Sequence, residues 1–318
     1  MFEHIAGNIE AKKILEFKIS AAKQKHEPLM ILIEGPSGVG KTSLCRAIAK
    51  ELNGNLIELM PKQINRPVDL LHTLRKLQLQ QLDTNGNKDS YPVLYIDESH
   101  TLRLEVQELL GVVMEGSFPS SALFSQASYQ IAPRFSLIGS TTMFGKLSRP
   151  FRERFAITLK LKPYSIEESV AIVNIHAQKH GITIEHSVAL AIAQRGKGTG
   201  RILVNHLKNI VDFALAEYGT TAITKDIALK AFEILGVDEL GLNETDRKVL
   251  KCLAECDRGS LGLNTLATLT NESVETIAYA VEPYLMEKNL LVRGSGGRSI
   301  TSAGLEYIYK TDNQYLTN

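Results

Sequence analysis

The chain has 318 residues, 44% hydrophobic and 22% charged, with a net charge of +1, a composition typical of a soluble globular protein of about two or three domains. No apolar stretch approaches the roughly 20 residues of a membrane span, and the first residues lack the pattern of a signal peptide. Three cysteines are too few for a disulfide framework, which favours a reducing, cytoplasmic compartment, and the low net charge restricts any nucleic-acid contact to a local patch.

The first motif along the chain is a glycine-rich loop. Residues 35–42 read Gly-Pro-Ser-Gly-Val-Gly-Lys-Thr and match the pattern G-x-x-x-x-G-K-[ST]. The apolar stretch 29–33 is predicted to be a buried strand and residues 42–52 a helix, which is the context that this phosphate-binding motif requires. A glycine-rich turn without a ligand is the alternative, and the context disfavours it.

The chemistry of this loop predicts that it binds a nucleoside triphosphate. Its glycines let backbone N–H groups surround the phosphates, Lys41 adds a positive charge at the β- and γ-phosphate oxygens, and Thr42 offers a hydroxyl to Mg²⁺. We therefore expect ATP and Mg²⁺ as ligands. The residues expected to hold them in this loop are Gly35, Gly38, Gly40, Lys41, Thr42 and Ser43.

An acidic pair ends the next predicted strand, 93–96. In enzymes with such a phosphate loop, the first carboxylate, here Asp97, holds Mg²⁺, and the second, here Glu98, can polarise the attacking water. Acidic pairs are common at strand ends, so this interpretation depends on the preceding loop. We expect Thr42 and Asp97 to be the metal ligands, and Lys41, Asp97 and Glu98 to be catalytic.

A third apolar strand, 135–139, ends in Ser140, Thr141 and Thr142, and three arginines follow at 149–154. A polar side chain at the strand end could contact the γ-phosphate, although a simple Ser/Thr-rich strand exit is the alternative. A guanidinium suits a transition-state phosphate, including one bound by a neighbouring subunit. Taken alone, the arginines could equally form a solvated surface patch.

The order of these elements predicts an α/β fold. The strands alternate with predicted helices at 10–24, 42–52 and 104–115, which indicates a parallel sheet with helices on both faces. Ligands of such sheets bind beyond the carboxyl ends of the strands. The phosphate loop, the acidic pair and the threonines all follow such ends.

After residue 164 the pattern becomes helical. Ser165-x-x-Glu168 is a capping box that opens a helix to about residue 180, and further helices are predicted at 187–195, 200–217 and 224–235. Arg201 begins one of these helices, where its charge opposes the macrodipole. A functional contact would explain that placement, and an exposed arginine is the alternative.

The last part of the chain is predicted to be a winged helix-turn-helix domain. Helices are expected at 244–256, 263–269 and 273–286, followed by two short strands around 293–298. From residue 242 to 318 there are 8 Lys/Arg and 10 Asp/Glu, a balance of −2, which disfavours a base-reading helix. Arg293 and Arg298 in the wing could grip phosphates without reading sequence, and a hairpin with two solvated arginines is the alternative.

Several segments together resemble the RuvB family, the Holliday-junction branch-migration motors of the AAA+ class. They are Phe-Ser-Leu-Ile-Gly-Ser-Thr-Thr (135–142), Phe-Arg-Glu-Arg-Phe (151–155), Gly-Thr-Gly-Arg-Ile (198–202), Gly-Leu-Asn (241–243), Val-Glu-Pro-Tyr-Leu (281–285) and the wing at 293–298. The resemblance covers nearly the whole chain. It implies an ATPase domain at 1–162, an all-helical lid at 163–238 and a winged-helix domain at 239–318.

The resemblance also implies roles for single residues. Thr142 resembles the sensor-1 residue, Arg154 the arginine finger that acts on a neighbouring subunit, and Arg201 the sensor-2 residue. Ile5 and Gly7 match the segment beside the adenine. Arg293 and Arg298 would contact the DNA backbone, without sequence preference, in a homo-hexameric ring that threads duplex DNA of a four-way junction, helped by a RuvA-type partner.

The chain departs from the family pattern at a few places. Asn8 stands where the family has Gln, Met143 where it has Arg, and Gly200 where it has Pro. The segment 116–134, where the family carries its RuvA-docking hairpin, is shorter and poorly matched, and the polar loop 82–90 looks inserted. The alternatives to a branch-migration motor are therefore a loader-like AAA+ switch, a protein-remodelling ATPase, or a relative that serves a different partner.

Overall fold

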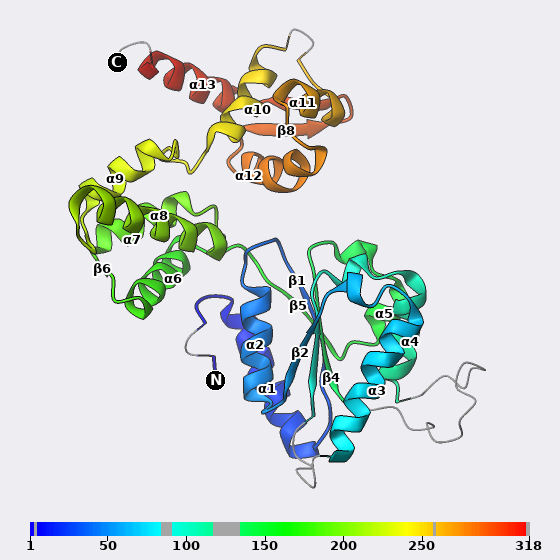
Figure 1. Cartoon of the computed structure of the whole chain (residues 1–318). Coiled ribbons are helices and arrows are strands. Elements are labelled where there is room, and N and C mark those ends of the chain that lie inside the picture. Colours follow the sequence, from blue (N-terminus) through cyan, green and yellow to red (C-terminus); the bar gives the residue numbers. More distant parts are fainter. Residues whose placement is uncertain (3–4, 84–90, 117–133, 257–258, 316–318) are drawn as a thin grey trace. The chain divides into compact units, whose positions relative to one another are not determined.

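The computed structural model describes residues 1–2, 5–83, 91–116, 134–256 and 259–315 (Figure 1). Contacts divide the chain into two compact units. Unit 1 comprises Met1–Ile175 with Gly198–Val204, and unit 2 comprises His176–Lys197 with Asn205–Asn318. Within the described ranges, no helix combines the length and the apolar character needed to cross a membrane.

Unit 1 is built on a five-stranded parallel sheet in the order β2-β3-β4-β1-β5. The three predicted strands are present as β1 (Met30–Glu34), β3 (Val93–Ile96) and β4 (Ser136–Thr141), in the buried centre of the sheet. The sequence analysis did not predict the two edge strands, β2 (Leu56–Leu59) and β5 (Ile157–Lys160), whose burial is incomplete.

Helices cover both faces of this sheet, which confirms the predicted α/β architecture (Figure 1). On one face α1 (Ile9–Lys25) and α2 (Lys41–Glu51) form a core with β1. On the other face lie α3 (Pro67–Asp83), α4 (Leu104–Met114) and α5 (Arg149–Glu153). Successive side chains of β1 point to opposite faces of the sheet. Ile31 and Ile33 therefore face α1 and α2, and Leu32 faces the other core. Because both faces are covered, the strand is apolar throughout.

The strand order brings the predicted motifs to one edge of the sheet. β4 lies between β3 and β1, and all three run parallel. The phosphate loop follows β1, the acidic pair follows β3, and β4 itself ends at Thr141. The carboxyl ends of these three neighbouring strands therefore present the motifs side by side.

The predicted helices after the sheet are all present, but the segment is not all-helical, because it also contains two short strands that were not predicted. It contains α6 (Ile166–Lys179), α7 (His186–Arg195), α8 (Gly200–Tyr218) and α9 (Lys225–Ile234), with two short paired strands, β6 (Thr183–Ile184) and β7 (Ala222–Ile223). The capping box is formed in both directions: Ser165 N donates to Glu168 Oε2 at 2.9 Å, and Glu168 N donates to Ser165 Oγ at 3.2 Å.

The predicted winged-helix fold is also present. It consists of α10 (Glu244–Ala254), α11 (Leu263–Thr270), the π-helical η4 (Thr276–Val281), α12 (Glu282–Glu287), the hairpin β8 (Leu291–Gly294) and β9 (Gly297–Ile300), and α13 (Ser302–Tyr315). Pro283 at the start of α12 coincides with the change of helix type, since proline lacks the N–H of a regular helix. Gly297 has φ +132, and an added Cβ would lie 2.3 Å from Leu261 O, so the wing requires glycine there.

Candidate active site

The phosphate loop joins β1 to the N-terminus of α2. Gly38 and Gly40 have φ values of +80° and +90°, a region that favours glycine. Lys41 is buried, and its Nζ donates to Gly35 O at 2.8 Å and to Pro36 O at 2.9 Å. Burial lowers the pKa of Lys41, and the nearby carboxylates of Glu98 and Asp97 oppose that shift. The loop thus combines a desolvated cation with the donor groups that a helix N-terminus leaves without an intrahelical partner.

Tyr164 connects the loop to the N-terminal segment, and the sequence analysis did not single it out. Its hydroxyl donates to Val39 O at 2.6 Å. A Cβ on Gly40 would lie 2.5 Å from the Tyr164 hydroxyl oxygen, and a Cβ on Gly7 would lie 2.7 Å from its ring. Burial raises the pKa of Tyr164 to about 12, so it remains a hydroxyl donor. The only signal in the sequence was its place directly after Pro163.

Of the two residues expected beside the adenine, Gly7 lies against this tyrosine, and Ile5 packs elsewhere on the N-terminal segment. Ile5 packs against the core shared by α1 and α2, and its carbonyl accepts a hydrogen bond from Lys12 Nζ at 2.9 Å. Asn8 N donates to Glu168 Oε1 at 2.9 Å, and Asn8 Oδ1 accepts from Lys162 N at 3.0 Å. The structure therefore brings Gly7 and Asn8 together with the chain segment 162–168.

Asp97 is tied to the end of β4. Its Oδ1 accepts from Ser140 Oγ at 2.5 Å and from Glu98 N at 3.0 Å. Ser140 Oγ also lies 3.0 Å from the Tyr95 hydroxyl, which lies 3.3 Å from Thr42 Oγ1. The two residues expected to hold Mg²⁺ are thus linked through Tyr95 and Ser140, neither of which was predicted as a site residue.

Glu98 is held by polar neighbours on one oxygen. Thr142 donates to Glu98 Oε2 from its hydroxyl at 2.9 Å and from its backbone N–H at 3.2 Å. His100 Nδ1 lies 3.2 Å from the same oxygen and 3.0 Å from Thr141 Oγ1. Burial lowers the pKa of His100, and the Glu98 carboxylate opposes that shift. Glu98 also has φ +45° and ψ +48°, a left-handed backbone that is unusual for a residue other than glycine.

The two candidate arginines of unit 1 contact different parts of the domain. Arg201 Nη1 lies 3.3 Å from Ser37 Oγ, so this arginine reaches the phosphate loop of its own chain. Arg154 donates through Nε to Glu115 Oε1 at 2.7 Å and through Nη1 to Pro150 O at 2.9 Å. These partners lie at the end of α4 and in α5, and neither belongs to the phosphate loop.

The two wing arginines differ in exposure. Arg293 is exposed on β8, whereas Arg298 on β9 is buried. Arg298 donates through Nε and Nη2 to Glu282 Oε2 at 3.2 and 3.1 Å, and Glu282 is itself buried. This differs from our expectation for Arg298, because a buried guanidinium that already binds a carboxylate is not free to meet a phosphate. The structure leaves the expectation standing for Arg293.

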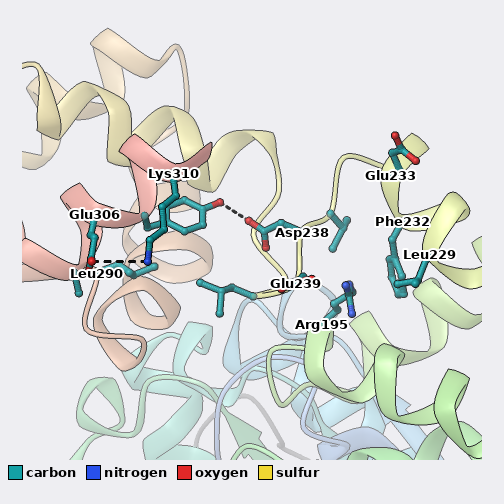
Figure 2. A pocket seen from close by; sticks show the side chains of 13 residues that line it. Arg195, Leu229, Phe232, Glu233, Asp238, Glu239, Leu290, Glu306 and Lys310 are labelled. Carbon is teal, nitrogen blue, oxygen red and sulfur yellow. Dashed lines mark hydrogen bonds and ion pairs between the residues drawn. The ribbon is translucent and has the colours of Figure 1, made fainter. Parts of the chain in front are cut away.

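Unit 2 contains a cavity of about 550 Å³, lined by residues of α7, α9, the segment 237–240 and α13 (Figure 2). Arg195 and Phe232 lie on one side of it, and Glu306 and Lys310 lie on the other. Tyr307 also lines the cavity and donates to Asp238. None of the predicted site residues lines this cavity. Among the described residues, no cluster of three or more His, Cys, Asp and Glu side chains could hold a metal ion.

Comparison with known proteins gives matches to three family models in chain order. They are the Holliday junction DNA helicase RuvB P-loop domain over residues 1–161, the RuvB AAA lid domain over 164–238 and the RuvB C-terminal winged helix domain over 239–309.

Whole-chain relatives give the same result. The RuvB subunit of the Holliday junction branch migration complex of Orientia tsutsugamushi is 35% identical over 313 residues, covering 95% of this chain and 91% of that protein. The corresponding Leuconostoc mesenteroides protein is 37% identical and covers 95% and 84%. The solved RuvB Holliday junction branch migration motor of Thermotoga maritima superposes with a TM-score of 0.80 at 33% identity, covering 96% and 95%.

Proposed function

The chain belongs to the RuvB family of ATP-dependent Holliday-junction branch-migration motors, and from that membership we propose how its own residues divide the work. It is a P-loop ATPase of the AAA+ class. We propose that it acts as a homo-hexamer in the cytoplasm, hydrolyses ATP with Mg²⁺ between adjacent subunits, and moves four-way-junction DNA. The domains that divide this work are 1–162, 163–238 and 239–318.

The phosphate loop supports the nucleotide part of the proposal. Lys41 is desolvated beside two carboxylates, and Arg201 reaches Ser37 in the same loop. Lys41 and Arg201 would therefore both bind the phosphates, together with the backbone N–H groups of 35–43. Ile5, Gly7 and Tyr164 would lie beside the adenine ring of the nucleotide.

Two residues, one at the start of α2 and one directly after β3, fit the ligands of a magnesium ion. Thr42 offers a hydroxyl and Asp97 a carboxylate, and oxygen atoms are the ligands that Mg²⁺ prefers. Asp97 Oδ1 already accepts two hydrogen bonds, which fixes the orientation of this carboxylate. A Mg²⁺ ion held by Thr42 and Asp97 would supply positive charge that stabilises the charge developing on the phosphates.

Glu98 is the proposed general base. A carboxylate at this position accepts the proton of the attacking water, and Thr142 holds one of its oxygens. Arg154 is the proposed finger for the site of the neighbouring subunit, because its guanidinium is held by Glu115 and Pro150 and not by the phosphate loop of its own chain. A guanidinium supplied in trans stabilises the transition-state charge.

DNA contact is assigned to the winged helix. Arg293 is exposed on the wing, and phosphate contacts of this kind position a protein on DNA without reading sequence. A RuvA-type partner is also proposed. The segment 116–134, where its docking site would be expected, lies almost entirely outside the described residues, so that contact depends on the family alone.

One observation carries the proposal: four predicted site residues lie together at the carboxyl edge of the sheet. They are Lys41, Asp97, Glu98 and Thr142. Steady-state ATPase rates with no DNA, with linear duplex and with a synthetic four-way junction, over a salt series, test it. We expect the junction to stimulate most and the stimulation to fall with salt, because phosphate contacts release counterions. A rate indifferent to all DNA, with an accessory protein present, would contradict the proposal.

A further inference from the structure

A row of hydroxyl groups in unit 1 connects the two residues proposed to hold Mg²⁺. The Tyr95 hydroxyl on β3 lies 3.3 Å from Thr42 Oγ1 on α2 and 3.0 Å from Ser140 Oγ on β4. Ser140 Oγ in turn donates to Asp97 Oδ1 at 2.5 Å. Thr42, Tyr95, Ser140 and Asp97 thus form one continuous line of hydrogen bonds.

The carboxylate at one end fixes the direction of every bond in this row. A carboxylate only accepts, and a hydroxyl has one proton to donate. Ser140 gives its proton to Asp97, so it accepts from Tyr95. Tyr95 has then used its own proton, so it accepts from Thr42. The Thr42 proton therefore points to Tyr95, and the lone pairs of Thr42 Oγ1 are left to bind another partner.

We propose that Tyr95 is a positioning residue for the cation, because its hydroxyl accepts the Thr42 proton and holds the Thr42 oxygen ready to bind Mg²⁺. The inference rests on the proposed function, in which Thr42 and Asp97 are the metal ligands. Through Ser140, the same row holds one oxygen of Asp97. A single buried side chain thus sets the orientation of both ligands, which come from different elements.

Packing alone does not account for the Tyr95 hydroxyl. Tyr95 is 1% exposed and sits between Leu94 and Ile96 on a strand that is otherwise apolar. A phenylalanine ring would fill the same space, and burying a hydroxyl is unfavourable unless it is hydrogen-bonded.

The test compares Mn²⁺ binding to the full-length wild-type chain and to Tyr95→Phe, at saturating ADP, with free Mn²⁺ followed by its electron paramagnetic resonance signal. The affinity for fluorescent mant-ADP in EDTA is measured in parallel. We expect Tyr95→Phe to weaken Mn²⁺ binding by about 3- to 10-fold, because Thr42 Oγ1 loses the hydrogen bond that orients it, and to leave metal-free mant-ADP binding unchanged. Unchanged Mn²⁺ affinity would overturn the inference. So would an equal loss of metal-free mant-ADP binding, because it would place the effect on the loop.

Two further variants keep the test independent of a packing effect. Ser140→Ala interrupts the same row one bond further along and is expected to weaken Mn²⁺ binding in the same direction. Because either change breaks the row, the double variant Tyr95→Phe/Ser140→Ala should bind Mn²⁺ no more weakly than the weaker single variant. Fully additive losses would contradict a continuous row.

A matched control and a metal-ligand variant complete the design. Tyr91→Phe removes another tyrosine hydroxyl, which donates to His26 O at 2.8 Å, and it should leave Mn²⁺ binding unchanged. Thr42→Ala distinguishes the two levels of the argument. If it binds Mn²⁺ as the wild type does, the proposed cation site itself is wrong. If it loses Mn²⁺ while Tyr95→Phe does not, only the role of Tyr95 is wrong.

Discussion

Thr142 donates two hydrogen bonds, one from its hydroxyl and one from its backbone N–H, to the same oxygen of Glu98, Oε2. The end of β4 therefore orients the carboxylate proposed as the general base. The left-handed backbone of Glu98 needs such support, because residues other than glycine rarely adopt this conformation.

Replacing Thr142 by valine keeps the shape of the side chain and removes the hydroxyl. We expect kcat for ATP hydrolysis to fall by about 10- to 100-fold, since a less well oriented base transfers the proton less efficiently, while KM changes little. Thr142→Ser should recover most of the rate. Steady-state kinetics of the two variants decide the point, and a Thr142→Val enzyme with wild-type kcat would contradict this role.

The assignment of Arg154 to a neighbouring subunit predicts complementation. Arg154→Ala should keep the assembly size seen by light scattering and lose about 10³-fold in kcat. Glu98→Gln should also be inactive alone. Mixed rings of the two variants would contain some intact interfaces, with Glu98 from one subunit and Arg154 from the next, and should regain ATPase activity.

A mixture that stays inactive would contradict action in trans. Arg149→Ala is the control, because Arg149 Nε contacts Glu153 Oε1 at 2.7 Å on the surface of the same short helix, and exposed pairs of this kind contribute little. Its ATPase rate should be that of the wild type.

The two wing arginines should give opposite phenotypes. Arg293→Ala should weaken junction binding and reduce its salt dependence, with the melting temperature unchanged. Arg298→Ala leaves the buried Glu282 without its partner, which destabilises a fold by about 3–5 kcal/mol. Fluorescence anisotropy and thermal unfolding separate the two effects. Equal loss of DNA affinity in both, with no loss of stability in Arg298→Ala, would show that Arg298 also contacts DNA.

The burial of His206 predicts that the stability of unit 2 falls at acid pH. Its ring lies 5.2 Å from that of Phe232, and burial lowers its pKa from 6.5 to about 4. Because the unfolded chain binds this proton more readily, the contribution of the neutral ring to stability is present above pH 6.5 and is lost as the pH falls toward 4. That loss amounts to about 2–3 kcal/mol.

Chemical unfolding of the wild type and of His206→Phe at pH 7 and pH 4.5 measures this contribution. The free energy of unfolding should fall more steeply for the wild type, by about 2–3 kcal/mol, because only it gains a proton at this position. Parallel pH dependences would contradict a buried neutral His206.

The sequence predicted the main elements because their signals are local. The phosphate loop has a fixed pattern, the capping box of Ser165 and Glu168 is read from four residues, and the central strands are continuous apolar runs. The edge strand β5 was missed because its alternating pattern lies in a short segment between two better-marked elements. The break at Pro283 within the third predicted helix also escaped notice, although proline is a known signal for such a change.

The missed site residues share one physical reason. Tyr95, His100 and Ser140 contact side chains of other elements, and the strand order β3-β4-β1 that brings them together is a tertiary property. Tyr95 in particular has the appearance of a core residue in the sequence. The burial of Arg298 was hidden in the same way, because its partner Glu282 lies on a different element 16 residues away.

The most direct test of the central claim is branch migration of a synthetic four-way junction, followed by gel resolution of the products, with ATP, with ADP, and with the Glu98→Gln variant. The assay is run with and without an accessory junction-binding protein. We predict ATP-dependent conversion of the junction to two duplex products by the wild type, and none with ADP or with Glu98→Gln. ATP hydrolysis without conversion of the junction under either condition would contradict the assignment of this chain as a branch-migration motor.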